Sequence, residues 1–184
     1  YRNGEWQYPY LDKIDTSGFV DMSFSALDSY DYQAELVNFD HGRILHVYKD
    51  EILQKLLCVG SYNDSLAEGV LFRYFNLDGS IDSSIYVNGI QLTHIYSDSD
   101  YKNKITKSVR IDSDRYLFLG VTENNYLTST MVKLDGTIDE SYGYQGTLID
   151  STILPLQNGY YVRQLFAEKI NNSIYVGKLE NVIS

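Results

Sequence analysis

Cysteine, proline, methionine and histidine are all scarce in this chain of 184 residues. It contains one Cys, two Pro, two Met and three His. A single thiol, Cys58, excludes an internal disulfide framework and a zinc site made of several cysteines. Cys58 lies in the apolar run Leu56–Val59, so we expect a buried and unreactive thiol. Three histidines leave little material for a metal centre, and we expect no cofactor and no metal.

Positive charge is also in short supply. Lys and Arg number 15 against 25 Asp and Glu, which gives a formal net charge of −10. This balance argues against nucleic-acid binding and against adhesion to anionic lipid, because both depend on basic side chains. No run of about 18 apolar residues exists, so we expect no membrane insertion. The first residues, Tyr1–Gly4, contain neither Met nor a signal sequence, so we expect a processed or excised chain.

Helical periodicity is weak. Residues 50–59 have apolar side chains at helical spacing, but they can equally form a loop that enters a strand at Leu56–Val59. Elsewhere, short β-branched and aromatic runs are separated by Asp, Asn, Gly and Ser, which is typical of an all-β fold of antiparallel sheets. The runs that we expect to be strands are Gly69–Phe75, Ser84–Val87, Tyr116–Val121, Thr130–Leu134, Tyr160–Val162 and Ser173–Val176.

One signature occurs three times, with a period of about sixty residues. It reads Gly-x-φ-Asp-x-Ser-φ, where φ is apolar or aromatic, and its copies lie at residues 17–24, 78–85 and 135–142. The glycines Gly18, Gly79 and Gly136 are 61 and 57 residues apart. A second signature, an apolar run ending in Gly60, Gly120 and Gly177, repeats after 60 and 57 residues. Two motifs with one period indicate about three structural repeats within a single domain, residues 1–184.

The signature has the composition of a tight turn. Asp-Gly between two β runs supplies the positive φ angles of a two-residue hairpin, and the next Asp and Ser can bond nearby backbone amides. An EF-hand calcium loop does not fit, because Ile81 interrupts the required oxygen spacing. The residues that we assign to structural turns are Asp78, Gly79, Asp82, Asp135, Gly136 and Asp139.

These residues resemble the bacterial delta-sixty repeat, a β-propeller-like repeat. The resemblance is best over Leu77–Ile85 and Leu134–Tyr142, whereas the first copy has Ser17 in place of the turn Asp. It implies propeller-type blades and a binding role, and it implies no catalytic residues. Three units with split ends favour a larger ring, self-association or an open stack over a free monomer.

Acidic pairs are the only other candidates for chemistry. Asp98/Asp100 and Asp112/Asp114 have the alternating spacing of a calcium loop but lack its Gly and Glu, so we expect solvated turns there. A glycosidase would need two carboxylates across a cleft, which sequence alone does not locate. Among the histidines, His41 is expected in a turn, His94 near a loop and His46 in a strand.

Charge is uneven along the chain. Residues 1–42 hold eight acids and two bases, and residues 102–115 hold five bases and two acids. Either these are solvated segments with lysines that guard a sheet edge, or copies of the chain meet through complementary charge.

Tyrosine is abundant, with 18 residues. Some must be core residues of the sheets, and others flank Asp, Ser and Gly in loops, where Tyr gives flat contact area with a polar tip. The candidate binding residues are Tyr30, Tyr32, Tyr142, Tyr144, Tyr160 and Tyr161. We therefore expect a non-enzymatic binding or structural module, outside the cell or in a virion, that contacts protein or glycan. The alternatives are a carbohydrate-active enzyme that uses an acidic pair and a pure assembly subunit.

Overall fold

A computed structural model describes residues 13, 14, 16–19, 39–64, 68–86, 90–96, 104–122, 126–150 and 160–182. In these residues the fold is all-β, with antiparallel sheets and no helix, as expected from the short apolar runs. The chain divides into two compact units, residues 1–92 and 93–184. Single-domain organisation over residues 1–184 stays a prediction.

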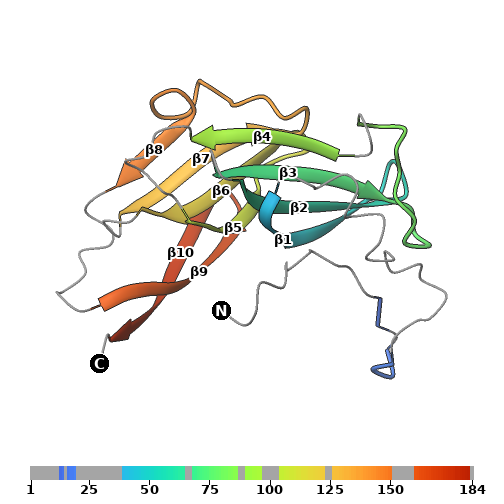
Figure 1. Cartoon of the computed structure of the whole chain (residues 1–184), viewed down its shortest axis with the longest axis horizontal. Helices are drawn as coiled ribbons and strands as arrows, with labels where there is room; N and C mark the ends of the chain where they lie inside the picture. The colour runs from blue at the N-terminus through green and yellow to red at the C-terminus, as the bar shows by residue number, and fades with distance from the viewer. Residues whose placement is uncertain are drawn as a thin grey trace. The chain divides into compact units, whose positions relative to one another are not determined.

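The first sheet is a four-stranded meander (Figure 1). Its strands follow one another in the order β1-β2-β3-β4, and β4 crosses the boundary between the two units. The strands are β1 (Phe39–Asp50), β2 (Lys55–Asp64), β3 (Glu68–Phe75) and β4 (Ile90–Tyr96).

The second unit repeats this meander and adds a hairpin (Figure 1). The meander has the order β5-β6-β7-β8, and the hairpin is a separate sheet of two strands. The strands are β5 (Lys104–Arg110), β6 (Arg115–Val121), β7 (Leu127–Lys133), β8 (Thr147–Asp150), β9 (Tyr160–Ile170) and β10 (Ser173–Val182).

The sequence period is also a structural period. Gly60 of β2 and Gly120 of β6 pair with Ile44 and Ile105 on the preceding strands. A register shift follows both isoleucines at the same place in the two sheets. Because a bulge inserts one residue and bends its strand, its occurrence at equivalent positions identifies β1–β4 and β5–β8 as copies of one unit.

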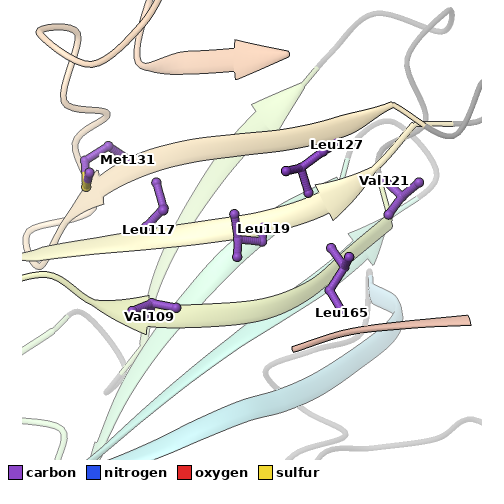
Figure 2. Packing of buried hydrophobic residues seen from close by; sticks show 7 residues of the cluster. All are labelled: Val109, Leu117, Leu119, Val121, Leu127, Met131 and Leu165. Atoms are coloured by element: carbon purple, nitrogen blue, oxygen red, sulfur yellow. The ribbon is translucent and has the colours of Figure 1, made fainter. Parts of the chain in front are cut away.

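The core of the second unit joins its sheet to its hairpin. Leu165 of β9 packs in one cluster with Val109, Leu117, Leu119, Val121, Leu127 and Met131 (Figure 2). Ile174 of β10 packs against the same cluster. Burying a side chain of this kind contributes about 1.5–3 kcal/mol. The hairpin is thus held to the sheet by apolar contact.

The hairpin and the sheet meet through equivalent faces. Ile174 occupies the repeat position of Leu117, since the two precede Gly177 and Gly120 by the same three residues. Leu117 belongs to the cluster described above, and Ile174 packs against it. Successive blades of a closed ring would instead meet through unlike faces, because one rotation relates every blade to the next.

The structure decides one open alternative and corrects two local expectations, the strand at Ser84–Val87 and the turn at His41. Residues 51–54 form a turn and β2 begins at Lys55, so the loop-and-strand interpretation of residues 50–59 holds and the helix does not. Residues 84–86 of the expected strand 84–87 are a turn and a bend. His41 lies within β1 rather than in a turn, and His94 lies two residues before the end of β4.

Candidate functional site

The signature residues form the same turn in both complete sheets. Gly79 and Gly136 have left-handed φ angles of 90° and 86°, which only glycine adopts without strain. The Gly79 amide donates to the Asn76 carbonyl at 3.0 Å, and the Gly136 amide donates to the Lys133 carbonyl at 2.9 Å. The loop therefore has three residues, ending in the glycine, rather than the two that we expected.

Aspartate carboxylates stabilise these turns by accepting hydrogen bonds. Asp78 Oδ1 accepts from the amide and the hydroxyl of Ser80, at 2.9 and 2.7 Å. Asp135 does the same for Thr137, at 2.8 and 2.7 Å. These hydrogen bonds to the charged form lower the pKa of both carboxyl groups.

The second Asp of each signature contacts both its own turn and a basic side chain at the start of a neighbouring strand. Asp82 Oδ1 accepts from the Ser84 amide at 2.9 Å, and its other oxygen accepts from the Lys55 ammonium. The Lys55 contact, reinforced by Ser84, lowers the pKa of Asp82 to about 2. In the next copy Asp139 Oδ2 lies 3.6 Å from Arg115, the repeat equivalent of Lys55. All six turn residues named from the sequence are thus engaged within the fold.

The two candidate tyrosines whose side chains are described, Tyr142 and Tyr144, have different surroundings. The Tyr142 hydroxyl lies 2.7 Å from Ser129 Oγ, and its ring packs against the core cluster. Tyr144, two residues later, is 81% exposed. Tyr160 and Tyr161 lie at the start of β9, and Tyr30 and Tyr32 fall outside the described residues.

The acidic pairs have structural partners where they are described. Asp112 accepts from Arg115 Nε at 2.8 Å and from the Asp114 amide at 3.0 Å, which lowers its pKa to about 2, with Arg115 as the main cause. Asp98 and Asp100 lie outside the described residues. Within the described part of the chain, no group of three or more His, Cys, Asp or Glu side chains could hold a metal ion.

Cys58 is fully buried in β2. Burial raises the pKa of its thiol to about 12, so the nucleophilic thiolate is scarce at neutral pH. His46 stacks on Tyr48 in β1, with ring centroids 4.2 Å apart, and is exposed. Among the residues that the structure describes, no helix is long and apolar enough to cross a membrane.

Among the residues that the structure describes, an exposed aromatic surface lies on the hairpin, and it was not found from the sequence. Alternation along the paired strands places Phe166, Glu168, Ile170 and Tyr175 on one face, which we call the outer face. An open groove of about 540 Å³ runs beside it. The groove is lined by Lys107, Phe166, Ala167, Glu168, Tyr175, Val176 and Gly177.

Comparison of equivalent positions shows how unusual this exposure is within the chain. Tyr175 is 60% exposed, whereas Phe118 at its repeat position in β6 is 1% exposed. Phe166 is 50% exposed, whereas the equivalent Ile105 in β5 is 4% exposed. Large exposed aromatic surface beside a groove marks contact sites in soluble proteins.

Sequence reasoning could have found part of this surface. The spacing to Gly177 identifies Tyr175 as the equivalent of a core position, and an aromatic side chain is suited to contact with a partner.

No protein family model, curated protein or solved structure matches this chain.

Proposed function

We propose that the chain is a non-enzymatic binding and assembly module made of delta-sixty-type sheets, and that it binds through the outer face of the β9–β10 hairpin. The observation that carries this proposal is the exposure of Tyr175 and Phe166 at positions that the complete sheet buries. Exposed aromatic area favours a macromolecular partner, either a protein surface or a glycan on which rings can stack.

The sheets act as blades in this proposal, but as an open stack. Equivalent faces meet within the second unit, through Leu117 and Ile174, which supports an open arrangement over a closed ring. An open stack leaves one face uncovered, and the outer face is that surface. The acidic, Cys-poor composition and the resemblance to bacterial repeats support a place on a cell surface or in a virion.

The outer face can be tested with a pair of matched double variants. Phe166→Ser with Tyr175→Ser removes its aromatic area, and Leu148→Ser with Ile149→Ser removes two apolar side chains of β8, each 44% exposed. The labelled chain is offered to a glycan array and to immobilised copies of itself. We expect binding to at least one, lost in the outer-face variant and kept in the β8 variant. Absence of binding to both, or equal loss in the two variants, contradicts the proposal.

A further inference from the structure

The outer face of the hairpin carries two aromatic side chains around a glycine. Gly177 of β10 pairs directly with Phe166 of β9, and Tyr175, two residues before Gly177, lies on the same face. Phe166 and Tyr175 are thus diagonal neighbours, and such neighbours are about 7–8 Å apart. A Cβ added at Gly177 would have Phe166 Cβ, 3.9 Å away, as its nearest neighbour. The two aromatic residues therefore flank an open patch whose floor is glycine backbone.

Polar groups of both signs border this patch. Glu168 of β9 is paired directly with Tyr175, so the two side chains are neighbours on the outer face. Lys107 of β5 lines the same groove. The groove volume of about 540 Å³ lies within the range of about 300–1,000 Å³ that is usual for ligand-binding clefts. The lining thus combines aromatic surface with one cation and one anion.

This lining suits a neutral ligand that is rich in hydroxyl groups. The charges of Lys107 and Glu168 balance, so the lining gives neither an anion nor a cation a net attraction. An ammonium donates hydrogen bonds, a carboxylate accepts them, and a hydroxyl group does both. Sugar rings combine such hydroxyl groups with apolar C–H faces that stack on aromatic rings.

We infer that the groove lined by β5 and the hairpin binds a neutral oligosaccharide. Tyr175 and Phe166 are its stacking surfaces, and Glu168 and Lys107 bond its hydroxyl groups. All four residues belong to the second compact unit, so the site is built within one body. Gly177 lets a sugar ring approach the backbone closely. The inference rests on the proposed function, and it names the ligand class of the outer face.

A glycan array sorted by charge gives the first test. It carries neutral oligosaccharides of glucose, galactose, mannose and N-acetylglucosamine beside their sialylated and sulfated forms, and the whole labelled chain is offered to it. We expect at least one neutral glycan to bind, and at least as strongly as its charged forms. Preference for charged glycans, or binding only to immobilised copies of the chain, would overturn the inference and leave the proposed function standing. Binding to none of these would overturn both.

Matched variants test whether the sugar lies in the groove. In calorimetric titration with the strongest neutral ligand, Tyr175→Ala should bind about tenfold more weakly, and Tyr175→Phe, which keeps the ring, should change little. Gly177→Ala should also weaken binding without lowering the melting temperature, because its Cβ fits the fold but occupies the floor of the groove.

Tyr126→Ala is the control for these variants. It removes a tyrosine that is 37% exposed and does not line the groove, so it should bind as the wild type does. An unchanged affinity of Tyr175→Ala, or an equal loss in Tyr126→Ala, would overturn the inference.

Discussion

The Lys55 ammonium donates to the Asp82 carboxylate, and this pair ties the beginning of β2 to the turn that follows β3. The next copy keeps the pair with Arg115 and Asp139. The signature aspartates are therefore a structural device of the repeat, which accounts for part of the acid excess.

The Asp82 carboxylate should contribute to stability. Asp82→Asn removes the charge that Lys55 and Ser84 bind, and we expect a loss of about 1–2 kcal/mol in the free energy of unfolding. Urea titration measures it. Asp114→Asn, at an exposed loop position, is the control and should change little. Equal stability of the Asp82 variant and the wild type would refute this role.

Acid should weaken the fold in a defined window. The folded pKa values of Asp82 and Asp112 are about 2, below the value of about 3.9 for an unfolded Asp. Their contribution is full above the unfolded pKa and is lost as the pH falls through the folded one. We expect the free energy of unfolding to fall between about pH 4 and pH 2, less steeply in Asp82→Asn. Parallel curves for the two proteins would argue against it.

The turn glycines should resist substitution. Gly79→Ala and Gly136→Ala place a Cβ in the left-handed region, at a cost of about 1–2 kcal/mol each. Gly177→Ala is the matched control, because no positive φ occurs there and the nearest atom to its added Cβ, on Phe166, is 3.9 Å away. In thermal unfolding, the control variant should have a clearly higher melting temperature than both turn variants.

The hairpin should depend on Leu165 for its attachment. This side chain is 1% exposed and lies in the core cluster, so Leu165→Ala should cost about 2–5 kcal/mol. Hydrogen exchange should speed up in β9 and β10 more than in β1–β3. A uniform increase in exchange would instead show that Leu165 stabilises the whole chain.

Much of the fold could be predicted because turns and buried strands have local signals. The apolar runs ending in Gly60, Gly120 and Gly177 located β2, β6 and β10. Residues 50–59 were open to a helix or to a loop that enters a strand, because their apolar spacing fits both; in the fold Asp50 Oδ1 accepts from the amides of Ile52 and Leu53 and closes a turn.

The outer face could not be predicted in the same way. Whether Phe166 and Tyr175 are buried depends on which strand or sheet lies beside the hairpin, and local composition carries no such information. The repeat alignment predicts that Phe166 and Tyr175 are buried, because their equivalents Ile105 and Phe118 are. The structure shows that both are exposed.

Hydrogen exchange of the β10 amides as a function of protein concentration tests the central claim most directly. If the outer face of the hairpin forms a contact between copies, protection of β10 should rise from dilute to concentrated solution while that of β2 and β6 stays constant. Protection of β10 that does not change with concentration, in a sample that also binds no glycan, would contradict the account.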